Sequence, residues 1–332
     1  MTAMLTALHR SRDQIVPALQ TAVQRLDPSS RLQASYHLGW CDADGKPTEG
    51  GGGKAVRPAL ALLSAEAAGA TAEVGVPGAV GVELVHNFSL LHDDLMDGDL
   101  ERRHRRTVWA IWGAPAAILA GDALLALAHE VVLESPSPHA GRAALLLATT
   151  TRELTRGQVQ DVAFESRSDV TLDECLDMAS GKTGALLAAS AAIGAVLAGA
   201  PEDVVDALTT FGGEVGLAFQ LVDDVLGIWG DPTVTGKPVH GDLRERKKTF
   251  PVLAALDSDT PGALRLATLL EAGGDPEEAA TLIETTGGRS AALAEARRHI
   301  TAVETALADA ALETGAVDEL RSLLGYLVRR DL

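Results

Sequence analysis

The sequence predicts an all-α protein that forms a single large helical bundle. Alanine and leucine are abundant, whereas aromatic residues make up only 3% of the chain. Valine and isoleucine rarely alternate with polar residues, so no stretch carries a clear strand pattern. Helical stretches follow one another with short connections, and no shift in composition or short repeat marks a second domain. We therefore expect residues 1–332 to form one domain.

The helices can be placed in chain order from apolar periodicity and from the residues that interrupt it. The first is an amphipathic helix over Thr2–Leu26, followed by a loop over residues 27–53 that ends in four glycines. Breakers separate the later helices, and these are Pro77, Pro115, 135–138, Pro201, Pro232 and 272–276. The later helices are predicted over residues 57–69, 78–97, 107–113, 115–133, 139–164, 171–180, 182–198, 202–228, 250–257, 262–273, 275–286, 288–314 and 316–328.

Composition excludes several classes of protein. A hydrophobic content of 46% over 332 residues is enough for a sizeable core. The net charge of −18 argues against a nucleic-acid partner, because phosphate backbones recruit basic surfaces. Cys41 and Cys175 are too few for a disulfide scaffold and lack metal-ligand spacing, which fits a reduced, cytoplasmic setting.

No membrane segment is predicted. The first residues lack a continuous apolar stretch of the signal-peptide kind. The longest apolar run, residues 184–200, is shorter than the roughly 20 residues that span a bilayer comfortably. We expect this run to be a buried core helix.

One acidic cluster stands out at the end of an apolar stretch, in "LLHDDLMDGDLERRHRR" (90–106). Asp93 and Asp97 are four residues apart and share a helix face, where like charges repel. They also meet the unfavourable end of the helix dipole. The preceding "VELVHNFSLL" is apolar on most faces, so a buried helix ends in carboxylates that need a cation. Mg²⁺ prefers oxygen ligands and binds phosphates as well. The competing interpretation is a solvated surface of mixed charge.

A second cluster repeats this pattern in "FQLVDDVLGIWGD" (219–231). Asp223 and Asp224 end an apolar run, and Asp231 falls on the face of Asp223 if the helix continues. Basic residues follow both clusters, at 102–106 and 244–248, and are too numerous merely to neutralise the aspartates. Arginine suits bidentate phosphate contacts and lysine acts as a point charge. The two clusters together predict metal ions that hold a diphosphate.

Other candidates are weaker by themselves. "GGGGKAVRP" (50–58) is not a P-loop, and we expect a flexible loop that delivers Lys54 and Arg57. "GKT" (181–183) would place Lys182 and Thr183 at a helix start, where a diphosphate binds well.

Several single residues keep two interpretations. Ligand contact and a structural role are equally open for His86. Gln220 would bond a diphosphate or satisfy backbone groups, and Asp161 would support the metal site or lie on a helix surface. Met96 and Trp109 fit the core better than a site.

Taken together, these segments resemble the trans-isoprenyl diphosphate synthases, the polyprenyl synthetase family. "DDLMD" (93–97) is similar to the first aspartate-rich motif of that family, and "RRHR" (102–105) to the arginine pair that follows it. The resemblance covers about residues 50–255. Further matching segments, in family order, are "GKAVRP" (53–58), "GQVQD" (157–161), "GKTGAL" (181–186), "FQLVDDVLGIWGD" (219–231) and "TGKPVHGDLRERKKTFP" (235–251).

The resemblance implies an all-α bundle around a central apolar cavity, usually a homodimer. It implies Mg²⁺-dependent condensation of an allylic diphosphate with isopentenyl diphosphate, in which three ions and basic residues stabilise the leaving diphosphate. By position, the metal ligands are Asp93, Asp97 and Asp223, supported by Asp94 and Asp224. The allylic diphosphate would be held by Arg102, Lys182, Thr183, Gln220, Lys237 and Lys247. Isopentenyl diphosphate would be held by Lys54, Arg57, His86 and Arg103.

Two positions depart from the family pattern. Gly227 stands where the second motif usually has its third aspartate. Either Asp231 compensates from one turn further along, or the third aspartate is dispensable. Arg106 stands where proline is common.

Three alternative functions remain open. A class I terpene cyclase usually carries a hydroxyl residue at the position of Gly227 and needs no isopentenyl diphosphate site. A non-catalytic regulatory subunit of a prenyl synthase would be expected to lose aspartates that this chain retains. A metal-binding structural bundle would not explain the lysines and arginines.

The resemblance also yields a prediction of product length. Phe88 and Ser89 lie five and four residues before Asp93, and one helical turn advances about 5.4 Å. In related synthases, an aromatic residue at both positions tends to stop elongation at farnesyl. A single aromatic at the deeper position tends to allow geranylgeranyl. The pair therefore predicts geranylgeranyl diphosphate as the main product, with farnesyl diphosphate next.

Overall fold

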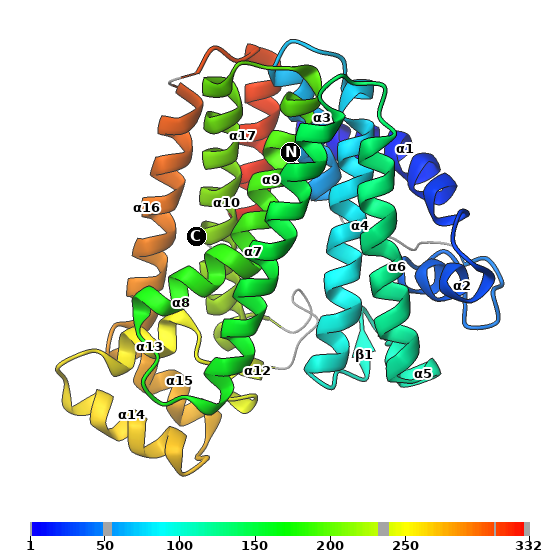
Figure 1. The fold of residues 1–332 in the computed structure, drawn as a ribbon. Helices are drawn as coiled ribbons and strands as arrows, with labels where there is room; N and C mark the ends of the chain where they lie inside the picture. Colours follow the sequence, from blue (N-terminus) through cyan, green and yellow to red (C-terminus); the bar gives the residue numbers. More distant parts are fainter. Residues whose placement is uncertain (1, 49–54, 232–238, 309, 329–332) are drawn as a thin grey trace. The chain divides into compact units, whose positions relative to one another are not determined.

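Helices make up most of the computed structural model, which describes residues 2–48, 55–231, 239–308 and 310–328 (Figure 1). The all-α prediction is confirmed. The elements in chain order are α1 (Thr2–Val23), α2 (Pro28–His37), α3 (Val56–Ala67), α4 (Ala72–Met96), β1 (Glu101–Arg102), β2 (Arg105–Arg106), α5 (Val108–Trp112), α6 (Ala114–Leu133), α7 (Ala140–Ser166), α8 (Leu172–Ala179), the π-helical turn η1 (Ser180–Gly184), α9 (Ala185–Ala198), α10 (Glu202–Trp229), α12 (Gly241–Arg244), α13 (Phe250–Leu256), α14 (Pro261–Glu271), α15 (Pro276–Thr285), α16 (Gly288–Ala308) and α17 (Thr314–Val328).

The loop predicted over residues 27–53 is wrong in its first part, where α2 lies. Asp27 caps this helix, because its carboxylate accepts hydrogen bonds from the backbone N–H groups of Ser29 (3.0 Å) and Ser30 (3.2 Å). Pro28 occupies the first helical position, where its fixed φ is suited to the helix and its missing N–H costs nothing. An aspartate followed by proline is thus a helix start here, although it also fits a turn.

Several predicted boundaries also move. α4 begins at Ala72 and continues through Pro77, which was expected to precede the helix. The helices predicted over 171–180 and 182–198 are joined by η1 into one continuous helical stretch. The helix predicted over 288–314 ends at Ala308. The short α12 and the β1–β2 pair were not predicted.

The chain divides into two compact units, and each is described by itself. The first comprises Met1–Thr151, Ala189–Thr209 and Ala310–Leu323. In its core, glycines allow helices to approach closely. A Cβ on Gly194 would lie 2.0 Å from the carbonyl oxygen of Ala61, and the Gly194 N–H donates to Ser64 Oγ at 3.0 Å. α4 packs against α3 and α6, so this unit holds the helix that ends in the first acidic cluster.

The second unit comprises Arg152–Ala188, Thr210–Asp309 and Leu324–Leu332. One apolar core joins the end of α10 to α12, α13 and α15, through residues such as Ile228, Leu243, Val252 and Ile283. This unit therefore holds the helix that carries the second acidic cluster. The prediction of a single domain over residues 1–332 stays a prediction.

Three helical stretches are long and apolar enough to cross a membrane by length and composition, namely α4, α6 and Leu172–Ala198. The expectation that residues 184–200 are too short is wrong, since the continuous stretch there has 27 residues. Yet 72% of its apolar window is buried within the protein, in agreement with a core helix. That no segment crosses a membrane stays a prediction.

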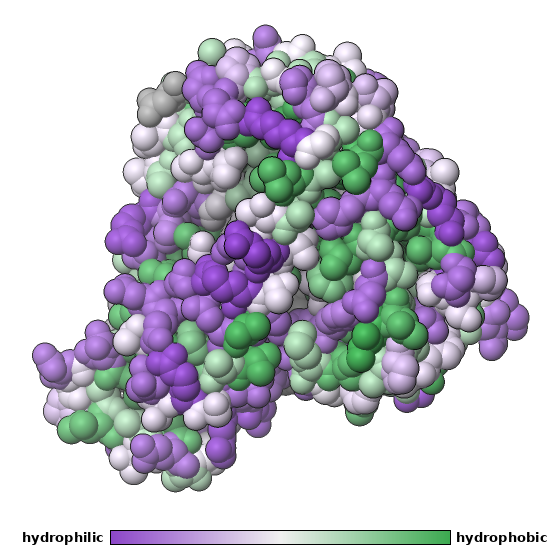
Figure 2. Space-filling model, in the orientation of Figure 1, coloured by the Kyte–Doolittle hydropathy of each residue, from purple (hydrophilic) through white to green (hydrophobic). Residues whose placement is uncertain are grey.

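α6 differs from the other two, because only 39% of its window is buried. Ile118, Leu119 and Leu133 expose 43%, 63% and 56% of their surface. Apolar side chains are visible over the region where α4 and α6 lie (Figure 2).

Candidate active site

A two-stranded hairpin follows the acidic end of α4. Its register pairs Glu101 with Arg106 and Arg102 with Arg105, which leaves Arg103 and His104 as a two-residue turn. Both turn residues have positive φ angles, 53° and 61°, which hairpin turns of this length require. Neither is glycine, and non-glycine residues in this region cost free energy and gather at functional sites. The strained turn holds the two adjacent arginines, Arg102 and Arg103, beside the end of α4.

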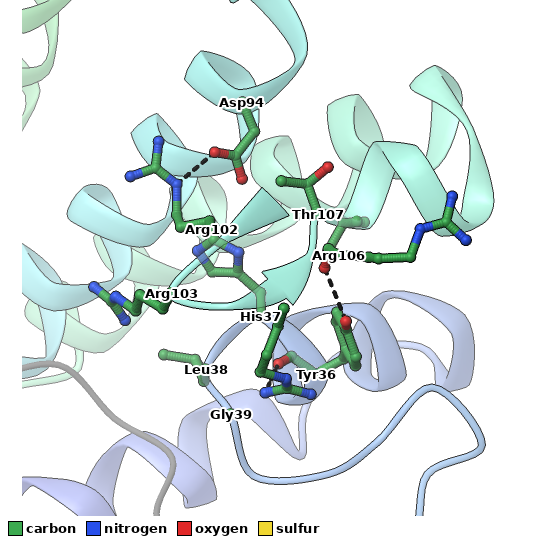
Figure 3. Close-up of a pocket in the computed structure, with 11 residues that line it drawn as sticks. Tyr36, His37, Leu38, Gly39, Asp94, Arg102, Arg103, Arg106 and Thr107 are labelled. Atoms are coloured by element: carbon green, nitrogen blue, oxygen red, sulfur yellow. Dashed lines mark hydrogen bonds and ion pairs between the residues drawn. The ribbon is translucent and has the colours of Figure 1, made fainter. Parts of the chain in front are cut away.

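Asp94 is the buried member of the first acidic cluster, with 1% of its surface exposed. One carboxylate oxygen accepts a hydrogen bond from Nε of Arg102 (Figure 3). The other oxygen is buried and has no hydrogen-bond partner among the described residues. Burial raises the pKa of Asp94, and the charge of Arg102 opposes that shift. Asp94 thus orients Arg102 from within the protein.

Asp93 and Asp97 carry the carboxylates that point to a metal. Asp97 terminates α4, where its N–H donates to the carbonyl of Asp93 at 2.9 Å, and its side chain is exposed. Asp93 is half-buried, and its carboxylate lies 3.6 Å from Nη2 of Arg102. Among the residues described, no three histidine, cysteine or acidic side chains are grouped closely enough to form a complete metal cage. Two hard oxygen ligands fit an ion such as Mg²⁺, which keeps waters and takes further oxygens from a phosphate.

Arg57 and His86 form a second group of the first unit. Nη1 of Arg57 lies 3.4 Å from Nε2 of His86. Burial lowers the pKa of both residues, and the pKa of His86 falls well below 6.5. Burial also raises the pKa of Glu83. The negative charge of Glu83 raises the pKa of Arg57 and of Arg103, and so opposes the effect of burial on both arginines. His86 is therefore neutral at pH 7, and the cations here exceed the nearby carboxylates.

A cavity of about 200 Å³ opens between the hairpin and α2. Asp94, Arg102 and Arg103 line one part of it, and His37 lines another (Figure 3). His37 ends α2, and the sequence interpretation missed it because residues 27–53 were expected to be a loop. Burial of the His37 imidazole lowers its pKa to about 3, and the positive charges of Arg103, Arg102 and Arg105 contribute to this shift. The cavity is thus rich in positive charge and holds a neutral imidazole.

Arg105 and Arg106 hold the hairpin in place. Arg105 stacks over the ring of Tyr36 at 4.1 Å and donates to the carbonyl oxygens of Tyr36 (3.0 Å) and Cys41 (2.7 Å). The Tyr36 hydroxyl donates to the carbonyl of Arg106 at 2.8 Å. Arg106, where the family commonly has proline, donates to the carbonyl of Ala110 at 2.6 Å and so joins the hairpin to α5.

In the second unit, Lys182 and Thr183 lie in η1, within a continuous helical stretch, so the prediction that they stand at a helix start is wrong. A Cβ on Gly157 would lie 2.1 Å from the backbone nitrogen of Lys182, so only glycine lets α7 approach this turn. Lys182 forms an ion pair with Asp161, and support of the metal site by Asp161 stays a prediction. π-helical turns are frequent at functional sites.

A hydrogen-bond chain then links η1 to α10. Thr183 Oγ1 donates to Oε1 of Gln220 at 2.7 Å, and Nε2 of Gln220 donates to Asp224 at 2.8 Å. The other oxygen of Asp224 accepts from the N–H of Phe250 at 3.2 Å. Burial raises the pKa of Asp224 to about 7, and the hydrogen bonds from Gln220 and Phe250 oppose the shift. Asp223, its neighbour, is exposed.

Gly227 has a structural explanation. A Cβ there would lie 1.9 Å from a carboxylate oxygen of Asp242, which is buried on α12. α10 ends at Trp229, so the prediction that Asp231 lies on a continuing helix face is wrong. Asp242, and not Asp231, has its carboxylate where a side chain from position 227 would point.

The remaining predicted site residues are placed unevenly. Lys54 and Lys237 lie outside the described residues. Nζ of Lys247 lies 2.9 Å from Glu245 on the surface of the second unit. The two acidic clusters belong to different units, so their joint use stays a prediction.

The two proposed length-determining residues lie on α4. Phe88 is 9% exposed and packs edge-on against His92, with ring centroids 4.9 Å apart. Nε2 of His92 lies 3.1 Å from the carbonyl of Ile118 on α6. Ser89 Oγ donates to the carbonyl of His86 at 2.8 Å. Phe88 is thus supported from the side by α6.

Comparison with known proteins places these features in context. The profile of the family described as "Polyprenyl synthetase" matches residues 46–285. A (2E,6E)-farnesyl diphosphate synthase from Mycobacterium tuberculosis is 54% identical over 334 residues, which cover 98% of this chain and 93% of that protein. A geranylgeranyl diphosphate synthase from the same species is 44% identical over 309 residues, with coverages of 91% and 88%.

Solved structures agree with the fold. The polyprenyl synthetase from Streptomyces coelicolor A3(2) superposes with a TM-score of 0.94 at 51% identity, over 98% of this chain and 99% of that one. A geranylgeranyl pyrophosphate synthase from Corynebacterium glutamicum, solved with isoprenyl diphosphate and magnesium, has a TM-score of 0.82 at 26% identity, over 98% of each chain.

Proposed function

Because this chain belongs to the polyprenyl synthetase family, we propose that it is a Mg²⁺-dependent trans-prenyltransferase that joins an allylic diphosphate to isopentenyl diphosphate. The observation that carries the proposal is the cavity of the first unit. There, Arg102 and Arg103 lie beside carboxylates at the end of α4. A cation-rich cavity next to hard oxygen ligands suits a diphosphate bound together with a metal ion.

In this proposal, the chain's own groups bind and orient two diphosphates. Arg57, His86 and Arg103 hold isopentenyl diphosphate, together with Lys54. The allylic diphosphate is held by Arg102, Lys182, Thr183, Gln220, Lys237 and Lys247. Asp161 orients the Lys182 ammonium, and Asp224 orients the amide of Gln220.

The metal ligands are Asp93, Asp97 and Asp223, and we propose three Mg²⁺ ions. When bound, these ions supply positive charge that stabilises the departing diphosphate. The basic residues stabilise the same charge as the allylic C–O bond breaks, and an apolar cavity excludes water from the resulting cation. The double bond of isopentenyl diphosphate then forms the new C–C bond, and a proton is lost to the departed diphosphate.

We also propose a homodimer. The exposed apolar side chains of α6, among them Ile118, Leu119 and Leu133, support this, because less of its apolar window is covered than in α4. We also propose that the protein is located in the cytoplasm.

For the product, two observations point to neighbouring chain lengths. Phe88 with Ser89 favours geranylgeranyl diphosphate, as predicted from the sequence. The relative at 54% identity, a farnesyl diphosphate synthase, favours farnesyl diphosphate as the second candidate. We propose geranylgeranyl diphosphate as the main product and treat farnesyl diphosphate as the alternative.

A direct assay separates these functions. Purified protein is incubated with labelled isopentenyl diphosphate, Mg²⁺ and one allylic diphosphate at a time, and product length is read by chromatography after dephosphorylation. The proposal expects a linear prenyl diphosphate whose formation requires isopentenyl diphosphate. A cyclic hydrocarbon formed without it would instead identify a terpene cyclase. Activity seen only after addition of a partner synthase would identify a regulatory subunit.

A further inference from the structure

We propose that His37 is a diphosphate-binding residue, whose Nε2–H donates to the isopentenyl diphosphate that Arg57, His86 and Arg103 hold. This inference rests on the proposed function and adds a residue from α2 to that binding site. Four observations of the first unit carry it, and they concern the position of His37, its unpaired nitrogen, its charged neighbours and the cavity beside it.

The position comes first. α2 ends at His37, and the hairpin is fastened to this helix end by Arg105 and by the Tyr36 hydroxyl. Because Tyr36 and Arg105 are used in that attachment, the next residue, His37, is presented to the cavity formed with Arg102 and Arg103. Figure 3 shows the imidazole of His37 beside Arg102.

The second observation is an unmet hydrogen bond. Nε2 of His37 is shielded from solvent, yet it has no hydrogen-bond partner among the described residues. Buried polar atoms are nearly always paired, so an exception in a native protein calls for a ligand, a water or a functional role. The neighbouring Asp94 also has an unpaired buried oxygen, which lines the same cavity.

The third observation selects an anion. The positive charges of Arg103, Arg102 and Arg105 lower the pKa of His37. Those of Arg57 and Arg103 lower the pKa of His86. Charge on His37 also lowers the pKa of His86, so the two histidines are electrostatically coupled. The charges of these arginines would repel a cation and attract the negative charge of a diphosphate. Neutral imidazole supplies one N–H donor without adding charge.

The fourth observation is space. The cavity of about 200 Å³ is well above the roughly 30 Å³ that one water occupies. A single water on Nε2 would therefore leave most of the cavity and its arginines unused. A diphosphate group presents several oxygens, and these can accept bonds from Arg103 and His37 together.

The test uses two substitutions of His37 and one matched control. His37→Leu removes the donor at similar size, and His37→Gln retains an N–H near the position of Nε2. His9→Leu, the same kind of substitution at an exposed position of α1, serves as the control. Steady-state rates are measured with each substrate varied in turn.

His37→Leu should raise KM for isopentenyl diphosphate about ten-fold, the loss expected for one hydrogen bond to a charged group. KM for the allylic substrate and kcat should change less than about two-fold. His37→Gln should recover most of the loss, and His9→Leu should leave the ratio of the two KM values unchanged. An equal change in both KM values, or none in either, would overturn the proposal.

Binding of inorganic diphosphate provides a readout that does not depend on turnover. Calorimetric titration with EDTA present confines binding to sites built from protein groups alone. Wild type should bind, His37→Leu should bind about ten-fold more weakly, and His9→Leu should match wild type. Equal affinity of wild type and His37→Leu would overturn the proposal. Failure of wild type to condense isopentenyl diphosphate in the separate assay would refute the proposed function without altering this comparison.

Discussion

The two acidic helix ends of this protein use different chemistry around their buried aspartates. At the end of α4, Asp94 faces the guanidinium of Arg102, and its negative charge also raises the pKa of Arg103. Near the end of α10, Asp224 faces an amide and a backbone N–H, and its pKa is raised to about 7. Burial raises the pKa of both aspartates. The charge of Arg102 opposes the shift at Asp94, whereas hydrogen bonds from neutral groups oppose it at Asp224.

This difference implies a division of labour. Arginines beside the first end attract anions, while a carboxyl with a raised pKa at the second end loses its proton more readily when a cation is near. Similar sequence motifs thus lead to unlike electrostatics, because their neighbours differ. The following predictions test that contrast, beginning with the largest expected effect.

The largest effect is expected from Asp93→Asn combined with Asp97→Asn. Asp93 is half-buried and Asp97 is exposed, and the two substitutions remove their carboxylate charges. Asp94, which orients Arg102, stays in place. Turnover with Mg²⁺ as the sole divalent ion should fall by several orders of magnitude, on the order of 10³-fold or more, as for loss of a metal that stabilises developing charge.

Circular dichroism should show unchanged helicity in this double variant. Asp122→Asn on the exposed face of α6 serves as the control and should retain full turnover. Near-normal turnover in the double variant would remove the metal assignment at this end.

Gly227→Asp restores the aspartate that the second end lacks and should nevertheless impair the protein. Its Cβ would lie 1.9 Å from the buried carboxylate of Asp242, so two like charges would be forced together. We expect a loss of about 2–3 kcal/mol in the free energy of unfolding, typical of a buried clash or unpaired charge. Chemical denaturation measures this loss.

Two further variants sharpen that experiment. Gly213→Ala lies on the same helix, and its Cβ would meet only an ordinary contact with Ala188 at 3.9 Å, so it should not destabilise. Gly227→Asp combined with Asp242→Ala should recover much of the lost stability. If Gly227→Asp alone is as stable as wild type, Asp242 does not occupy that space.

Arg57→Ala tests the anion-binding role of the first end. Losing one charge-assisted contact should raise KM for isopentenyl diphosphate about ten- to hundred-fold, with a much smaller effect on the allylic substrate. Arg25→Ala provides the control, because Arg25 is a surface residue already paired with Glu130 and Glu134. An unchanged KM for isopentenyl diphosphate in Arg57→Ala would assign the arginine cluster to structure.

Product length tests whether α4 also forms the floor of the chain-binding cavity. Phe88→Ala should lengthen the main product, because it removes a ring that His92 supports from the side of α6. Ser89→Phe should shorten the product toward farnesyl. Chromatography of dephosphorylated products measures both shifts, and wild-type length in both variants would place the floor on another helix.

The sequence predicted the helical class, most helix positions and the family, because apolar periodicity and motif spacing are local properties. It missed α2 and therefore His37, since an Asp-Pro helix start resembles a turn in isolation. It placed Asp231 on the face of Asp223 on the condition that the helix continues, and α10 ends at Trp229. The partner of Gly227 comes from α12, and such a contact between distant segments leaves no periodic trace.

The last difference between the two ends concerns the proton on Asp224. Its folded pKa of about 7 lies above the usual value of 3.8, so the protonated form is favoured in the native state. The stability that this group contributes is therefore complete below about pH 4 and is lost as pH rises through 7. Its slope approaches 1.4 kcal/mol per pH unit at most, in the middle of that window. The stability contributed by His37, whose pKa falls from 6.5 to about 3 on folding, instead rises with pH over part of the same range.

The measurement is accordingly the difference in free energy of unfolding between wild type and Asp224→Asn, by denaturation at pH 4, 5, 6, 7 and 8 without divalent ions. That difference should shift against wild type as pH rises. A difference that stays constant with pH would show that Asp224 is ionised throughout, and the two acidic ends would then be electrostatically alike.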